Sequence, residues 1–192
     1  MWVVKLGGSL MEDPSLKEWL FVLAEYGAGR VVIVPGGGRF KDLIHKLQKR
    51  WRIGDRIAHC MAILAMRQTG LLFLGLEARL ELARTEQIAG VLNRGKTAVW
   101  LPEVAELDRA KVPSNWAVTS DSLAAWLAGR LCAHSLVLVK SKAPESCDPV
   151  ELKNRGIVDE AFLDWLPQVE FSCLSKNDWA QFSQKLQIPG AP

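Results

Sequence analysis

Two glycine clusters stand early in the chain, and each follows a short apolar run. They are KLGGSL at residues 5–10 and VPGGGRF at residues 34–40. Glycine has no Cβ and tolerates positive φ, so backbone N–H groups in such loops can surround an anion. Lys5, at the end of the first run, would bring an ammonium to the same place. Each cluster alone is more typical of a turn and matches neither GxxxxGK[ST] nor GxGxxG, but two on one sheet edge favour phosphate binding.

The elements that position these clusters alternate between strands and helices. Short apolar runs predict strands at residues 2–6, 30–34, 97–102, 135–140 and 168–174. Helical spacing of apolar residues predicts one helix after Pro14 and further helices at residues 38–51, 55–82 and 119–131. The helix at 119–131 would be capped by Thr119 or Ser120. A last helix would include Trp179, Phe182 and Leu186. We therefore expect one α/β domain over residues 1–192, a three-layer α/β/α sandwich on a mostly parallel sheet. The irregular stretch 140–149 follows a strand at the edge where such folds bind ligands.

The composition is that of a soluble globular protein. Hydrophobic residues make up 49% and charged residues 23% of the 192 positions, and the net charge of +3 comes with no basic stripe for nucleic acid. The most apolar stretch, residues 61–76, carries Arg67 near its centre, which favours a buried helix over a membrane span. The N-terminus lacks the pattern of a signal peptide. The four cysteines form no CxxC pair, so we expect no metal site and reduced thiols in a cytoplasmic protein.

Four motifs, taken in order and spacing, resemble the amino acid kinase superfamily. They are KLGGSL, VPGGG, TSDSLAAWLA and LVLVKS, and the resemblance covers roughly residues 1–175. Within the superfamily, GDRIAHCMAILAMRQ and the C-terminal region are most similar to the small kinases of methanofuran and tetrahydromethanopterin biosynthesis. Those kinases make a diphosphate from an aminomethylfuran phosphate. The resemblance implies an acceptor-side half at residues 1–118 and a shortened nucleotide-side half at residues 119–192.

The resemblance also implies ATP as the phosphoryl donor, Mg²⁺, and a set of site residues. Lys5 would contact the transferring phosphoryl group, and Asp121 would hold lysines in register, although an acidic residue also suits the first turn of any helix. Lys140, at a strand end, would lie on the nucleotide side or simply in solvent. The glycine loops would serve phosphates: Gly7, Gly8 and Ser9 those of the nucleotide, and Gly36, Gly37 and Gly38 the acceptor and the γ-phosphate.

The acceptor side is expected around GDRIAH at residues 54–59. In UMP kinases the matching aspartate lies beside the acceptor nucleoside, so Asp55 is the candidate for a polar acceptor group such as an ammonium; its alternative is a helix N-cap. Arg39 and Arg56 are candidates for the acceptor phosphate, because a guanidinium binds phosphate through two hydrogen bonds. His59 lies one turn after Asp55, and a half-buried histidine without a site role is its alternative.

One departure leaves the function open at this stage. The VDG(V/I)Y segment that packs near adenine in the family is absent, and KSKAPESCDP stands there instead. A non-enzymatic nucleotide- or oxyanion-binding protein therefore remains an alternative, as does a kinase for UMP or isopentenyl phosphate. The helix expected over residues 57–76 is apolar almost all round, which predicts a homodimer or an assembly of dimers.

Overall fold

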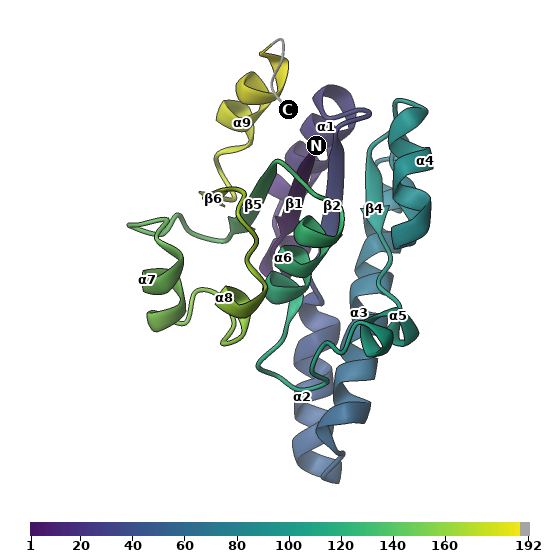
Figure 1. Cartoon of the computed structure of the whole chain (residues 1–192), viewed down its shortest axis with the longest axis vertical. Helices are drawn as coiled ribbons and strands as arrows, with labels where there is room; N and C mark the ends of the chain where they lie inside the picture. The colour runs from purple at the N-terminus through teal and green to yellow at the C-terminus, as the bar shows by residue number, and fades with distance from the viewer. Residues whose placement is uncertain (189–192) are drawn as a thin grey trace.

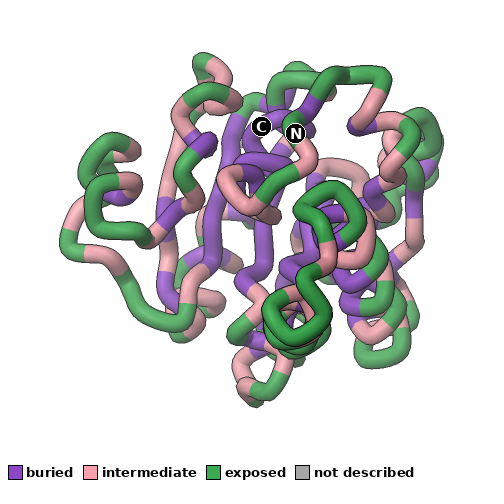
Figure 2. Tube along the Cα trace, turned by 90° about the horizontal axis from the view of Figure 1, so that it is seen from below, coloured by how far each residue is buried: buried purple, intermediate pink, exposed green. Residues whose placement is uncertain are grey.

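The computed structural model describes residues 1–188 and confirms the α/β class, with six parallel strands in the order β3-β4-β2-β1-β5-β6. The strands are β1 (Trp2–Leu6), β2 (Val31–Pro35), β3 (Glu81–Ala83), β4 (Ala98–Trp100), β5 (Ser135–Lys140) and β6 (Glu170–Ser175). The central strands are buried on both faces, as continuous apolar runs predict, and the exposed residues gather on the outer helices and loops (Figure 2).

Helices cover both faces of this sheet (Figure 1). The longer ones are α1 (Ser15–Tyr26), α2 (Gly38–Trp51), α3 (Asp55–Leu76), α6 (Ser120–Arg130) and α9 (Trp179–Gln187). The shorter ones are α4 (Ile88–Asn93), α5 (Val104–Arg109), α7 (Pro149–Asn154) and α8 (Phe162–Trp165), with 3₁₀ turns η1 (Gly8–Glu12) and η2 (Thr85–Gln87). In Figure 1, α2 and α3 lie side by side at one end of the molecule, where they pack against each other.

The alternation of side chains along β1 divides the interior into two cores. Trp2, Val4 and Leu6 face α1 and α9, whereas Val3 faces α6. The same period of two turns Lys5 toward α6, which places a charged side chain on the face where the rest of the strand is apolar. Burial of this ammonium, at 4% exposure, requires a partner on α6.

The two glycine clusters touch each other at the carboxyl ends of β1 and β2. A Cβ added at Gly8 would lie 2.4 Å from the backbone nitrogen of Gly38, and one added at Gly36 would lie 2.5 Å from that of Gly8. Gly38 also has a φ of +52°, which disfavours any L side chain. The loops that follow neighbouring parallel strands lie side by side, and only glycines allow their backbones to come so close.

The prediction of a helix over residues 55–82 was wrong at its end. The helix α3 stops at Leu76, Glu77 has an extended backbone, and residues 81–83 form the edge strand β3 beside β4. The stretch LEARLELAR consists largely of helix-forming residues, but pairing with β4 overrides that weak local preference.

The same helix is buried on one face only. Ala58, Ile63 and Phe73 are buried, whereas Ile57 and Leu64 are more than half exposed. Among residues 1–188, α3 is the one helix that is long and apolar enough to cross a membrane, yet it packs against α2 and three strands of the sheet. The expectation of a buried helix was therefore correct for one side of α3 alone.

The contact between the glycine loops predicts that Gly8→Ala is destabilising. The new Cβ must push the backbone of Gly38 away, and such overpacking costs about 1–3 kcal/mol of unfolding free energy. Gly75→Ala is the matched control, because this glycine lies within α3 with nothing within 4 Å of an added Cβ. We expect the melting temperature to fall for Gly8→Ala and to stay or rise for Gly75→Ala. Equal melting temperatures would show that the loops are not in contact.

Candidate active site

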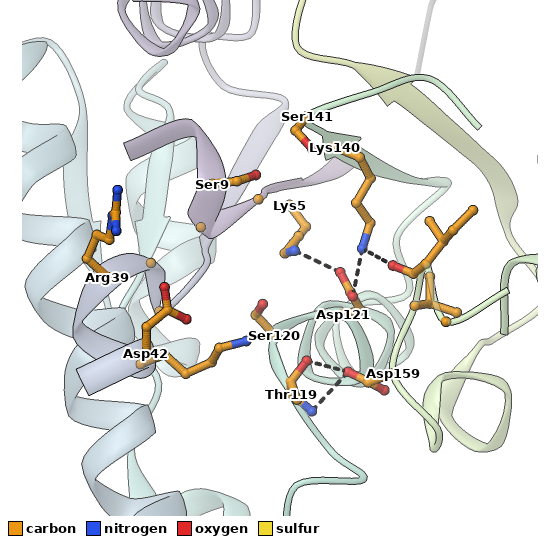
Figure 3. A pocket seen from close by; sticks show the side chains of 18 of the residues that line it. Lys5, Ser9, Arg39, Asp42, Thr119, Ser120, Asp121, Lys140, Ser141 and Asp159 are labelled. Atoms are coloured by element: carbon orange, nitrogen blue, oxygen red, sulfur yellow. Dashed lines mark hydrogen bonds and ion pairs between the residues drawn. The ribbon is translucent and has the colours of Figure 1, made fainter. Parts of the chain in front are cut away.

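A buried carboxylate lies between two ammonium groups at the carboxyl ends of β1 and β5. The Nζ of Lys5 is 2.8 Å from Oδ1 of Asp121, and the Nζ of Lys140 is 2.8 Å from Oδ2 (Figure 3). β5 pairs with β1, and Leu136 and Leu138 face α6, so the alternation along β5 turns Lys140 to the same side as Lys5. Asp121 stands in the first turn of α6 and reaches both lysines.

The electrostatics of this group, which we call the Lys-Asp-Lys triad, favour an anion. Burial alone would raise the pKa of Asp121, but the ammonium groups of Lys5 and Lys140 outweigh it and hold that pKa below its usual value. Burial and the neighbouring Lys5 lower the pKa of Lys140, and Asp121 offsets part of this effect. With both lysines charged, the triad carries one net positive charge.

A short segment of the C-terminal part holds Lys140 and caps the helix that carries Asp121. The backbone oxygen of Ile157 accepts a hydrogen bond of 2.7 Å from Nζ of Lys140. Two residues later, Asp159 Oδ2 accepts hydrogen bonds from the Thr119 and Ser122 amides and the Thr119 hydroxyl, at 2.7–3.0 Å, and Oδ1 accepts one from the Ser122 hydroxyl. The prediction of a cap from Thr119 or Ser120 was therefore wrong in its chemistry: Thr119 is at the N-cap position, but a distant carboxylate caps α6.

The triad opens onto a cleft of about 610 Å³, a size typical of small-molecule sites. Its lining brings together the following predicted residues: Lys5, Gly7, Gly8, Ser9, Gly37, Gly38, Arg39, Asp121 and Lys140. Gly36 is not part of the lining, because its amide donates to the Leu6 carbonyl at 3.0 Å and its backbone packs on Gly8. Helix α2 and the turn η1 both begin at this edge, and the first N–H groups of a helix lack internal acceptors.

Asp55 and Arg56 do not line this cleft, contrary to where the sequence places them. An oxygen of Asp55 accepts a hydrogen bond of 2.7 Å from the side chain of Gln48. Arg56 binds both carboxylate oxygens of Asp108, at 2.5 and 2.7 Å. Sequence spacing puts these residues at the start of the right helix, but the first turn of α3 begins after α2 has led the chain away from the sheet.

His59 lies in a second, smaller cavity of about 20 Å³ next to the cleft. The two cavities share Lys41 and Ser120 in their walls. His59 is 4% exposed, and its Nε2 has no hydrogen-bond partner within residues 1–188. Burial and the charge of Arg56 lower the pKa of this imidazole, and Asp108 offsets part of the effect, so His59 is neutral at pH 7.

Several cleft residues were missed by sequence reasoning. Lys41 and Asp42 follow the second glycine cluster within α2, and their position soon after that loop was a usable signal. Asp159 and Ile157 gave no such signal, because their segment carries no motif and their partners lie 17–40 residues away along the chain. Ile157 pairs with Lys140 at a separation of 17, and Asp159 with Thr119 at a separation of 40.

The fold and the site together define the class of protein. Residues 1–143 match the amino acid kinase family, and the chain belongs to this family. A [5-(aminomethyl)furan-3-yl]methyl phosphate kinase from Methanocaldococcus jannaschii is 29% identical over 140 residues, which are 72% of this chain and 64% of that relative. The match thus spans less than two thirds of the relative's length.

Solved structures share the fold at lower identity. Uridylate kinase from Archaeoglobus fulgidus superimposes with a TM-score of 0.71 and 14% identity, over 97% of this chain and 95% of that one. UMP kinase from Bacillus anthracis gives 0.70 and 15%, over 95% and 90%. This chain therefore shares its overall fold with these two kinases.

The buried imidazole predicts a pH dependence of stability. Because the pKa of His59 is lower in the folded than in the unfolded chain, the unfolded state binds more protons, and stability falls as pH drops below about 6.5 toward the folded pKa. We expect the melting temperature of the wild type to fall more than that of His59→Leu between pH 7.5 and pH 5. His134→Leu, at a histidine whose side chain is 56% exposed, is the control and should follow the wild type. Parallel curves for wild type and His59→Leu would contradict the assignment.

Proposed function

We propose that this protein is an ATP-dependent phosphotransferase whose acceptor is a small molecule that already carries a phosphate. The observation that carries the proposal is the Lys-Asp-Lys triad at the edge of the cleft, between two glycine loops. Phosphoryl transfer asks a protein chiefly for positioning and for stabilisation of charge on the transferring group. Two ammonium groups fixed by one buried carboxylate supply that charge without a general base.

Each part of the cleft has a role in this proposal. Lys5 and Lys140 contact the phosphoryl oxygens, and Asp121 keeps the two ammonium groups apart and oriented. Gly7, Gly8 and Ser9 receive the nucleotide phosphates, and the start of α2 at Gly37, Gly38 and Arg39 receives the acceptor phosphate and the γ-phosphate. The side chain of Arg39 also pairs with Glu12 at 2.6 Å, which holds it over the start of α2.

The cleft fits nucleotide phosphates better than it fits a protein-held metal. Residues 1–188 contain no group of three or more His, Cys, Asp or Glu side chains that could hold an ion. Asp121 is taken by the lysines, and Asp159 by α6. Mg²⁺ would therefore be held mainly by the phosphates of ATP, where it neutralises their charge, as is usual for this ion.

The acceptor proposed first is [5-(aminomethyl)furan-3-yl]methyl phosphate, which would become a diphosphate in the synthesis of a C1-carrier cofactor. The 29% identical relative carries this acceptor in its name. UMP and isopentenyl phosphate are the competing acceptors, and a nucleotide-binding protein without transfer activity is the competing class. We infer a cytoplasmic protein, in line with the free thiols of Cys60, Cys132, Cys147 and Cys173.

We also infer that two copies pair through an apolar face on α2 and α3. The face consists of exposed side chains and a groove of about 250 Å³ between them: Phe40, Leu43, Leu47, Ile57, Met61, Leu64 and Leu71. Ile57, Leu64 and Leu71 repeat every seven residues, which is the spacing of a helix seam that packs against another helix. An exposed apolar face of this kind marks an interface, and a homodimer, or an assembly of dimers, is the simplest occupant.

A transfer assay with Mg-ATP and three acceptors tests the function. We expect turnover with the aminomethylfuran phosphate and a lower kcat/KM with UMP and with isopentenyl phosphate. Lys5→Met should lower kcat by about 10²–10³, because one stabilising charge on the transition state is lost. Circular dichroism should show that the variant remains folded. No transfer to any acceptor would support the non-enzymatic alternative, and unchanged turnover in Lys5→Met would remove the role of Lys5.

Light scattering tests the assembly. We expect the wild type at micromolar concentration to have at least twice the mass of the 21.3 kDa chain. Leu64→Glu puts a charge in the centre of the apolar face and should yield the monomer. Val150→Glu, at an exposed apolar residue on α7, is the control and should leave the mass unchanged. A wild-type mass of one chain would contradict the dimer.

A further inference from the structure

Most charged side chains that line the cleft are already bound to other parts of the protein. Lys5 and Lys140 share Asp121, Arg39 pairs with Glu12, and Asp159 caps α6. The remaining two are Lys41 and Asp42, and within residues 1–188 neither makes a hydrogen bond or an ion pair through its side chain. A bound molecule is therefore offered one free cation and one free anion besides the triad.

Asp42 is placed apart from the triad. It lies in the second turn of α2, and Figure 3 shows it on the α2 side of the cleft, with Asp121 and Lys140 on the other side and Lys5 between them. Arg39, one turn earlier on the same helix, pairs with Glu12 at 2.6 Å and interacts with Asp42 only through a weaker charge attraction. Asp42 is exposed to solvent at the wall of the cleft, so a cationic group on a ligand can reach its carboxylate without displacing a partner within the protein.

We propose that Asp42 is the specificity residue for an acceptor that carries an amine, and that its carboxylate binds the ammonium at the end remote from the phosphate. This inference rests on the proposed function, because the acceptor phosphate must lie between Lys5 and the glycine loop at the start of α2, with the rest of the acceptor extending along α2 toward Asp42. A molecule with a phosphate at one end and an ammonium at the other matches the two sides of the cleft in charge. An acceptor that has a neutral group in place of the ammonium leaves Asp42 unpaired.

This assignment moves the role from Asp55, where the sequence places it, to a residue on α2. Asp55 bonds to Gln48 outside the cleft, whereas Asp42 lies in the wall and is free. The two aspartates thus give opposite expectations for the same substitution. Asp164, an exposed aspartate on α8 that does not line the cleft, offers a neutral comparison.

The experiment compares two acceptors that differ only in charge: the aminomethylfuran phosphate and its hydroxymethyl counterpart. We expect the wild type to prefer the amine. Asp42→Asn should lower kcat/KM for the amine by about 10- to 100-fold, mostly through KM, because a charge-assisted hydrogen bond is lost. For the hydroxymethyl acceptor kcat/KM should change by less than about twofold, and the KM of ATP should not change. Asp42→Glu should restore part of the preference, and Asp164→Asn should behave as the wild type.

Each other outcome overturns the inference in an identifiable way. An equal loss with both acceptors would show a general role for Asp42, and a loss that excess Mg²⁺ reverses would make it a metal ligand. A loss of preference in Asp55→Asn, with Asp42→Asn unaffected, would return the role to Asp55. If the wild type transfers phosphate to neither acceptor, the acceptor proposed first is wrong, and this inference is wrong as well. A wild type that is active on both acceptors but equally so overturns the inference alone.

Discussion

Two ammonium groups at the ends of neighbouring strands share one buried carboxylate, and the arrangement of the site depends on that carboxylate. Burial and, to a smaller extent, repulsion from Lys5 lower the pKa of Lys140, and the Asp121 carboxylate between the two lysines offsets part of this effect. A buried charge without its partner is strongly unfavourable, so α6 must keep Asp121 in place. The helix start is fixed in turn by Asp159, and the glycine loops shape the space in front of the lysines. Strand pairing, helix position and loop composition thus serve one electrostatic arrangement.

The sequence predicted the parts of the fold that bury continuous apolar runs. β1 and β5 were expected at residues 2–6 and 135–140 and occupy these ranges, because an uninterrupted apolar run suits a strand that is covered on both faces. The edge strand β3 was missed because only its pairing with β4 distinguishes it from a helix end. The short helices α4, α5, α7 and α8 were missed as well, since four to six residues carry too little periodicity for a helix to be inferred.

The candidate site likewise contains residues that the sequence could place and residues that it could not. Lys5 and Asp121 stand in local motifs, and parallel strand order brings them together, so the sequence could place them. The positions of Asp55 and Arg56 depend on where α2 ends and how α3 turns away, which local pattern does not encode. The sequence does not show that Asp42 and Lys41 lack a side-chain partner, because this follows only from the contacts of the other charged groups that line the cleft.

The segment that holds Lys140 and caps α6 has a consequence for the order in which the site is completed. Lys5, Asp121 and Lys140 all precede residue 143, where the match to the family ends, whereas Ile157 and Asp159 come after it. A chain synthesised from its N-terminus therefore contains every charged member of the triad before it contains the groups that anchor them. Until residue 159 has been added, the first turn of α6 lacks its cap and the Lys140 ammonium lacks its carbonyl partner. The charges of the Lys-Asp-Lys triad become fixed late in synthesis, through a stretch of chain that contains no recognisable motif.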